Sequence, residues 1–135
     1  MRIGYAFGSE TLISTLEAVK NSYNSYTMDS LALAVGEASI RDEAYFRETC
    51  RKVAATRDRA ADELRALGFE VTPSLANFLF ATHPKKAAPE IFSALRGKGI
   101  FIRYFKLPRI DNHLRITVGT DEQMDALIAA LKQIL

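Results

Sequence analysis

Apolar residues recur every three to four positions through the first half of the chain, the spacing of amphipathic helices. The pattern predicts helices over about residues 10–21, 28–40 and 42–67. Ser9 can cap the first of them, and Gly68 can end the third. A helix of about 26 residues is about 39 Å long, which exceeds the width of a small domain. We therefore expect the third helix to connect two bodies or to lie across one.

Beyond Gly68 the pattern changes to short apolar segments that are typical of strands. The strands are expected at residues 69–71, 77–81, 100–105 and 114–118, with helices over 88–97 and after 120. One more short strand is expected at residues 3–7. The order from residue 69 is β-β-α-β-β-α. It predicts an α+β fold: a small antiparallel-type sheet with helices on one face, preceded by a helical segment.

The strand at 114–118 leads directly into the last helix. Gly119 ends the alternation of the strand, and Thr120 can cap the helix. Gln123 follows the cap by three residues, which is the spacing of a capping box. The junction is therefore predicted to be a sharp turn from strand to helix.

Two arginines interrupt otherwise apolar strands. Arg115 lies on the face opposite Leu114 and Ile116, and Arg103 lies in the preceding strand. An unpaired guanidinium is costly to bury, so such an arginine faces water or an anion. If the two strands are neighbours, both guanidiniums could converge on one carboxylate or phosphate, the anions that arginine binds best.

Composition and charge argue against several classes of function. The 135 residues suit one domain with a proper core, and the formal charge of +2 is too small to indicate binding of nucleic acid or an anionic membrane. No apolar run is long enough for a membrane span, and the N-terminus does not resemble a signal peptide, so we expect a cytoplasmic protein. The single cysteine and two histidines lack metal-ligand spacing, so no metal site is expected.

The loop at residues 21–26 combines tyrosines with side-chain amides, among them Tyr23 and Asn24. Such a loop is usually a surface connection. Aromatic rings beside polar groups are also typical of small-ligand sites. Both interpretations stay open at this point.

Several segments, in this order, resemble the C-terminal part of a histidinol-phosphate aminotransferase, a fold-type I enzyme that depends on pyridoxal phosphate. They are RIGYA at 2–6, VKNSYN at 19–24, PSLANFL at 73–79, GIFIR at 99–103 and LRITVGT at 114–120. The last is the most specific. The resemblance implies that residues 1–40 are a remnant of the large cofactor-binding domain, and that residues 41–135 are the small domain with the linking helix.

The resemblance also implies roles for individual residues. Arg2 matches the arginine that binds the cofactor phosphate. Arg115 matches the arginine that binds the substrate carboxylate or an equivalent anion, and Arg103 matches a second arginine suited to the phosphate of histidinol phosphate. Tyr23 and Asn24 fall in a loop near the family's active site and are further candidates for substrate binding.

In the family, the Schiff-base lysine lies a few residues before the position of Arg2, where this chain has only Met1. We therefore expect no catalytic residue in this chain, no transaminase activity of the chain alone, and no retention of pyridoxal phosphate. The parent enzyme would transfer an amino group between glutamate and imidazole-acetol phosphate in histidine biosynthesis. It would act as a homodimer.

Two alternatives remain at this stage. A related fold-type I enzyme, such as a threonine-phosphate decarboxylase or an aromatic-amino-acid aminotransferase, would use a two-arginine site equally well. A free-standing binding or interaction domain could also have the order β-β-α-β-β-α. It would have a well-packed N-terminal segment, whereas a fragment would pack residues 1–40 poorly.

Overall fold

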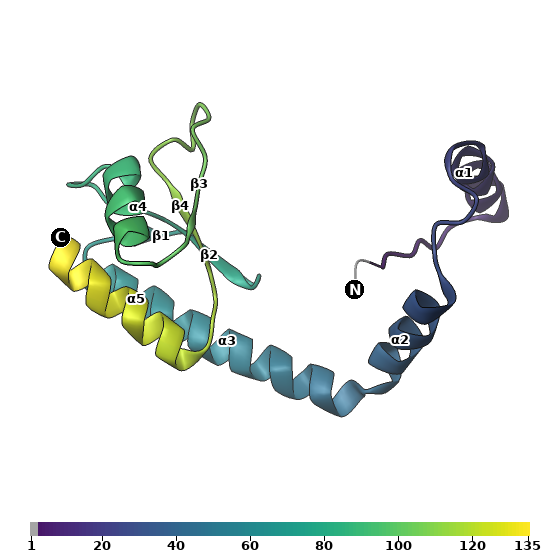
Figure 1. The fold of residues 1–135 in the computed structure, drawn as a ribbon, viewed down its shortest axis with the longest axis horizontal. Helices are drawn as coiled ribbons and strands as arrows, with labels where there is room; N and C mark the ends of the chain where they lie inside the picture. Colours follow the sequence, from purple (N-terminus) through teal and green to yellow (C-terminus); the bar gives the residue numbers. More distant parts are fainter. Residues whose placement is uncertain (1–2) are drawn as a thin grey trace. The chain divides into compact units, whose positions relative to one another are not determined.

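The computed structural model describes residues 3–135. The chain forms two compact units that divide between Arg47 and Glu48 (Figure 1). Helix α3 (Glu43–Ala66) begins in the first unit, and most of its length belongs to the second. Each unit is described by itself below.

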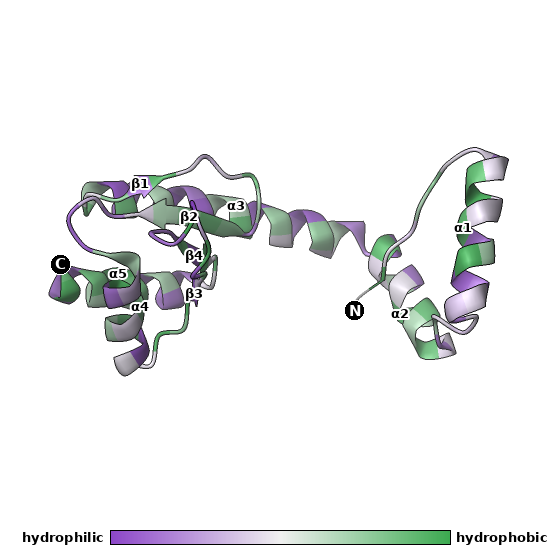
Figure 2. Ribbon diagram, turned by 90° about the horizontal axis from the view of Figure 1, so that it is seen from above, coloured by the Kyte–Doolittle hydropathy of each residue, from purple (hydrophilic) through white to green (hydrophobic). Residues whose placement is uncertain are grey.

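The first unit contains helices α1 (Glu10–Tyr23) and α2 (Ser30–Arg41). Both begin at side-chain caps. Ser9 accepts a hydrogen bond from the Leu12 amide, as its position predicts, and Asp29 accepts one from the Ala32 amide. Neither helix has a buried residue, although both contain apolar residues (Figure 2).

The prediction of a strand at residues 3–7 is wrong, because this segment forms no regular secondary structure. A strand needs a neighbour to pair its backbone groups, and every strand of the described residues lies beyond residue 69. Ile3 instead lies against α2, where a Cβ added at Gly36 would come within 2.8 Å of its Cδ1 atom.

The second unit contains a four-stranded sheet. Its strands are β1 (Glu70–Val71), β2 (Phe78–Thr82), β3 (Arg103–Tyr104) and β4 (Leu114–Thr117). They lie in the order β1-β2-β4-β3, and each neighbouring pair is antiparallel. With the two helices α4 (Ala88–Gly97) and α5 (Asp121–Ile134), the chain order is the predicted β-β-α-β-β-α, so the α+β prediction is confirmed.

One face of this sheet is covered by helices. Leu79 and Ala81 of β2 and Leu114 and Ile116 of β4 are buried on this face. They form one hydrophobic core with residues of three helices: Ala60, Ala61 and Leu64 of α3, Ala88, Ile91 and Leu95 of α4, and Met124, Leu127, Ile128 and Leu131 of α5. In Figure 1, α5 runs beside the later part of α3. The opposite face of the sheet carries no helix from this core.

Glycines end two of the helices and shorten the strands that follow. At Gly68, φ is 89°, and the Phe69 amide donates to the Leu64 carbonyl. At Gly99, φ is 77°, and the Ile100 amide donates to the Leu95 carbonyl. This is the Schellman pattern, which uses the amides that would otherwise start the next strand. The bond from the Ile100 amide accounts for the loss of Ile100 from the strand predicted at residues 100–105, of which β3 forms only Arg103–Tyr104.

The turn from β4 into α5 is the predicted capping box. The Thr120 side chain accepts from the Gln123 amide, and the Gln123 side chain accepts from the Thr120 amide. Gly119 leaves room for this arrangement, because a Cβ there would lie 2.3 Å from Oε1 of Gln123.

Candidate functional site

The two predicted arginines face each other across neighbouring strands. Arg103 of β3 and Arg115 of β4 are direct Cα partners in the antiparallel register. On β4, Leu114 and Ile116 point into the core, so Arg115 lies on the helix-free face of the sheet. Like charges directly opposite each other destabilise a sheet. The fold therefore keeps an electrostatically unfavourable pair at this position.

Aromatic rings cover these two arginines. The Cζ atom of Arg103 lies 5.1 Å from the centroid of the Phe105 ring, and that of Arg115 lies 5.9 Å from the same centroid. Arg115 also lies over Phe78, at 5.4 Å. All three distances are in the range of cation–π attraction. Phe105 and Phe78 were missed in the sequence, although strict alternation places both on the arginine face.

Neither arginine has a carboxylate partner among residues 3–135. The Nε atom of Arg115 is buried and makes no hydrogen bond. A guanidinium binds an anion through its planar edge and an aromatic ring through its face, so contact with a ring does not use the groups that bind an anion. The pair can therefore bind an anion with at least two oxygen atoms.

His113 directly precedes β4 and lies two residues before Arg115, so alternation places it on the same face of the sheet. Its ring stacks on Phe80, with 4.7 Å between centroids and 10° between planes. Its Nδ1 atom is buried without a hydrogen bond. The two buried side-chain nitrogens that lack partners in the described part of the chain therefore both belong to this face.

Two of the other predicted site residues belong to the first unit. Tyr23 is the last residue of α1 and is 94% exposed. Asn24 caps the end of α1, and its side chain accepts a hydrogen bond from the Tyr26 amide. Both belong to the first unit, whereas the arginine pair belongs to the second. Arg2 lies outside the described residues.

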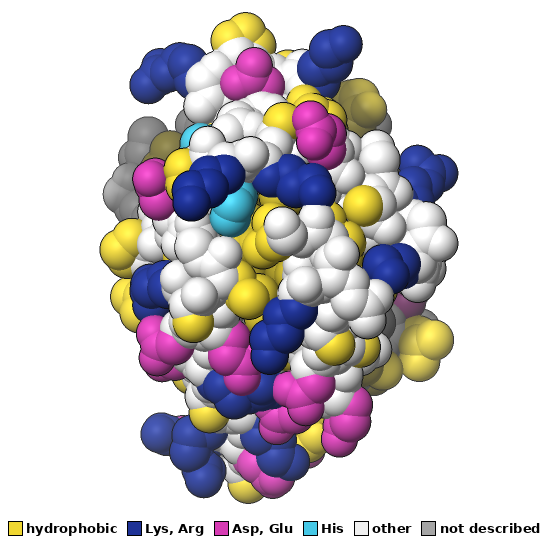
Figure 3. All heavy atoms as spheres, turned by 90° about the vertical axis from the view of Figure 1, so that its left-hand side faces the viewer, with side chains coloured by type: hydrophobic (Ala, Val, Ile, Leu, Met, Phe, Trp, Pro, Cys, Tyr) yellow, Lys and Arg dark blue, Asp and Glu magenta, His cyan; other side chains and the backbone are white. Residues whose placement is uncertain are grey.

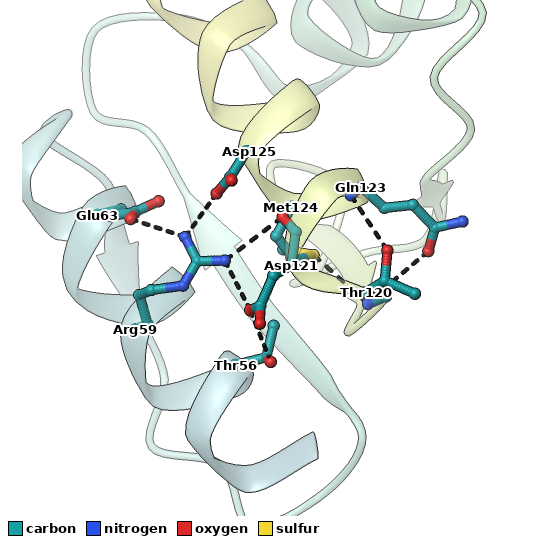
Figure 4. Close-up of polar contacts among 9 residues, drawn as sticks. Thr56, Arg59, Glu63, Thr120, Asp121, Gln123, Met124 and Asp125 are labelled. Atoms are coloured by element: carbon teal, nitrogen blue, oxygen red, sulfur yellow. Dashed lines mark hydrogen bonds and ion pairs between the residues drawn. The ribbon is translucent and has the colours of Figure 1, made fainter. Parts of the chain in front are cut away.

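Arg59 of α3, by contrast, is an arginine whose guanidinium is paired with carboxylates of the same chain (Figure 4). Its guanidinium donates to Glu63 at 2.9 Å, to Asp121 at 2.8 Å and to Asp125 at 2.7 Å. Hydrogen bonds to these carboxylates, first of all Asp121, raise the pKa of Arg59 further above its ordinary value. The same contact with Arg59, together with one from Thr56, lowers the pKa of Asp121. Arg59 is thus satisfied internally and joins α3 to α5.

Three further observations limit the kind of site. Within residues 3–135, no group of three or more His, Cys, Asp or Glu residues could hold a metal ion. Every helix of the same residues is too short or too polar to span a bilayer. On the face shown in Figure 3, Lys and Arg side chains are interspersed with Asp and Glu.

Comparison with known proteins places the chain in one family. The family model "Aminotransferase class I and II" matches residues 1–131. A histidinol-phosphate aminotransferase of Dechloromonas aromatica is 54% identical over 99% of this chain, and one of Marinomonas sp. is 52% identical over 98%. The chain spans 38% of the length of each of these relatives.

Solved structures agree with these relatives. The crystal structure of histidinol-phosphate aminotransferase from Sinorhizobium meliloti in complex with pyridoxal-5'-phosphate matches 90% of this chain with a TM-score of 0.80 at 30% identity. The match covers 34% of that chain. A structure from Erwinia carotovora, at 23% identity and a TM-score of 0.85, supports the fold. The chain therefore belongs to the aminotransferase class I and II family.

Proposed function

We propose that this chain is the part of a pyridoxal-phosphate aminotransferase that binds the charged end of the substrate. The parent enzyme would transfer an amino group between glutamate and imidazole-acetol phosphate, in the biosynthesis of histidine. The observation that carries the proposal is the pairing of Arg103 and Arg115 on an open face, without a carboxylate partner among residues 3–135. The names of the relatives at 54% and 52% identity support this choice of substrate.

The arginine pair would act by positioning. Two guanidiniums on neighbouring strands can hold the phosphate or the carboxylate of a substrate in one orientation. Fixing one end of the substrate brings the amino-bearing carbon repeatedly to the same place, which lowers the entropic cost of reaction. These residues would therefore bind and orient the substrate without exchanging protons with it.

Pyridoxal phosphate would supply the electron sink for amino transfer in the parent enzyme. The resemblance assigns Arg2 to its phosphate, and Arg2 lies outside the described residues. The unpartnered nitrogens of Arg115 and His113 lie on the face of the arginine pair, and we assign that face to the substrate.

Further parts of the proposal concern the parent protein. Residues 1–40 would be a remnant of its large cofactor-binding domain, and residues 41–135 would be its small domain with the linking helix. Tyr23 and Asn24 would be further substrate-binding residues of the parent. The parent would be a cytoplasmic homodimer.

We also propose that residues 1–135 alone do not catalyse transamination or retain the cofactor. The test is an assay of purified chain with pyridoxal phosphate, glutamate and imidazole-acetol phosphate, in which 2-oxoglutarate is measured. A complete histidinol-phosphate aminotransferase, assayed in parallel, shows that the assay works. We expect no 2-oxoglutarate above the rate without protein. Formation of 2-oxoglutarate that depends on the chain would contradict the proposal that residues 1–135 alone are inactive.

A further inference from the structure

We propose that Phe105 is a positioning residue that holds Arg103 and Arg115 at the spacing needed to bind one anion. The inference rests on the proposed function and adds a residue to its site. Arg103 and Arg115 are direct Cα partners on neighbouring strands, and no carboxylate among residues 3–135 separates or neutralises their two positive charges. Without another attraction, repulsion would turn the two side chains away from each other into water.

Phe105 supplies an attraction that both arginines share. Its ring centroid lies 5.1 Å from Cζ of Arg103 and 5.9 Å from Cζ of Arg115. The face of an aromatic ring is negative, so it attracts each guanidinium. Phe78 contacts Arg115 alone, at 5.4 Å. Phe105 is therefore the ring that both arginines contact in the described part of the chain.

The backbone around Phe105 keeps the ring in place. Tyr104 of β3 packs toward the core, where its ring lies 5.7 Å from that of Phe92, and Phe105, which directly follows the strand, lies beside the arginines on the other face. The loop that follows Phe105 is anchored at Asn112. Its Oδ1 atom accepts from the Ala88 amide at 2.9 Å, and its Nδ2 atom donates to Oγ1 of Thr82 at 3.1 Å.

Stacking and anion binding use different parts of a guanidinium. The ring takes the flat face, whereas a phosphate or carboxylate binds the edge that carries the N–H groups. Phe105 can therefore fix the orientation of both arginines before the substrate arrives. Such preorganisation raises affinity because less side-chain freedom is lost on binding.

The test follows the Nε–H signals of Arg103 and Arg115 by NMR in residues 1–135, first without any anion. Phe105→Leu is expected to shift both signals, because the shared ring current is lost. Phe78→Leu is expected to shift only that of Arg115. Phe92→Leu removes a half-buried ring that contacts neither arginine and should shift neither. A shift of only one signal in Phe105→Leu, with the core amide signals unchanged, would overturn the inference.

Titration with inorganic phosphate gives the second arm. We expect Phe105→Leu to weaken phosphate binding by about three- to tenfold, and Phe105→Tyr to restore it, because tyrosine keeps the ring face. Equal affinity of wild type and a folded Phe105→Leu variant would contradict the positioning role. If phosphate leaves both wild-type signals unchanged, the proposed anion site itself fails. In that case the NMR comparison without anion still tests whether the Phe105 ring contacts both arginines.

Discussion

At the scale of single residues, the environment decides what an arginine does in this protein. Arg59 donates to three carboxylates and ties two helices together. Arg115 has a buried Nε atom without a partner and lies between two phenylalanine rings. The first arginine is satisfied by the fold, whereas the Nε atom of the second has no hydrogen-bond partner in the described part of the chain, and we propose that a ligand anion binds there. The two cannot be told apart by residue type or by charge.

Arg109 gives a test of backbone strain at this scale. It lies between β3 and β4 with a φ of 73°, a conformation that costs an ordinary residue about 1–2 kcal/mol. Arg109→Gly removes this cost but adds about 0.5–1 kcal/mol of chain entropy in the unfolded state. We expect a net stabilisation of about 0.5–1 kcal/mol, measured by urea unfolding.

The matched control is Arg51→Gly, in the exposed part of α3. Arg51→Gly is expected to lower the free energy of unfolding by about 1 kcal/mol. Glycine in a helix loses more chain entropy on folding, and at this position no left-handed strain is relieved in return. Equal loss of stability in both variants would show that the left-handed conformation of Arg109 carries no strain.

At the scale of elements, the contacts of Arg59 join α3 to the start of α5. The pKa of Asp121 is lowered mainly by its hydrogen bond from Arg59, so the folded state binds a proton here less readily than the unfolded chain. A carboxyl group with a lowered folded pKa stabilises the fold above its unfolded pKa of about 3.9. This stabilisation is lost as the pH falls through the lower, folded value.

Arg59→Gln should therefore lower the urea midpoint at pH 7. The difference from wild type should shrink as the pH is lowered from about 4 to about 2.5, because Asp121 becomes protonated. Arg51→Gln, on the same helix, should leave the midpoint nearly unchanged at both values. A difference between Arg59→Gln and wild type that stays constant over this range would exclude the ion pairs as its cause.

Helices could be predicted from the sequence more closely than strands. The helices expected at 10–21 and 42–67 are found at Glu10–Tyr23 and Glu43–Ala66, because their periodicity and caps are local. The strand expected at 100–105 has only two residues, and one reason is that the Ile100 amide bonds to the end of α4 instead of a neighbouring strand. The segment at 3–7 forms no strand because pairing requires a distant partner.

The same limit applies to the candidate site. The convergence of Arg103 and Arg115 could be predicted only on the condition that their strands are neighbours, which the structure shows them to be. The role of Phe105 could not be read from the chain, because it depends on the register that sets Arg103 opposite Arg115. The buried Nε atom of Arg115 depends in the same way on rings from two other segments.

At the scale of the whole molecule, the two units differ in how much they bury. The second unit contains the hydrophobic core, whereas α1 and α2 have no buried residue. Leu12, Leu16 and Val19 are 53%, 47% and 65% exposed on α1. Apolar faces of this kind are normally covered in a stable protein, which agrees with the proposal that the chain is part of a longer enzyme.

This contrast predicts uneven hydrogen exchange. Helices of 14 and 12 residues are marginal in water without packing, so the amides of α1 and α2 should exchange at nearly their intrinsic rates. The amides of β2, β4 and α5 in the same sample should be strongly protected and serve as the internal control. Protection of α1 equal to that of β4 at low protein concentration would show that the first unit is stable by itself.

We propose above that this chain binds the anionic end of a substrate through Arg115 and Arg103. The most direct measurement is calorimetric titration of residues 1–135 with histidinol phosphate and with histidinol, for wild type, Arg115→Lys and Arg109→Lys. We expect histidinol phosphate to bind at least about tenfold more tightly than histidinol, Arg115→Lys to lose about tenfold in affinity, and Arg109→Lys to match wild type. Equal affinity for the two ligands, or an Arg115→Lys variant that binds histidinol phosphate as wild type does, would contradict the claim.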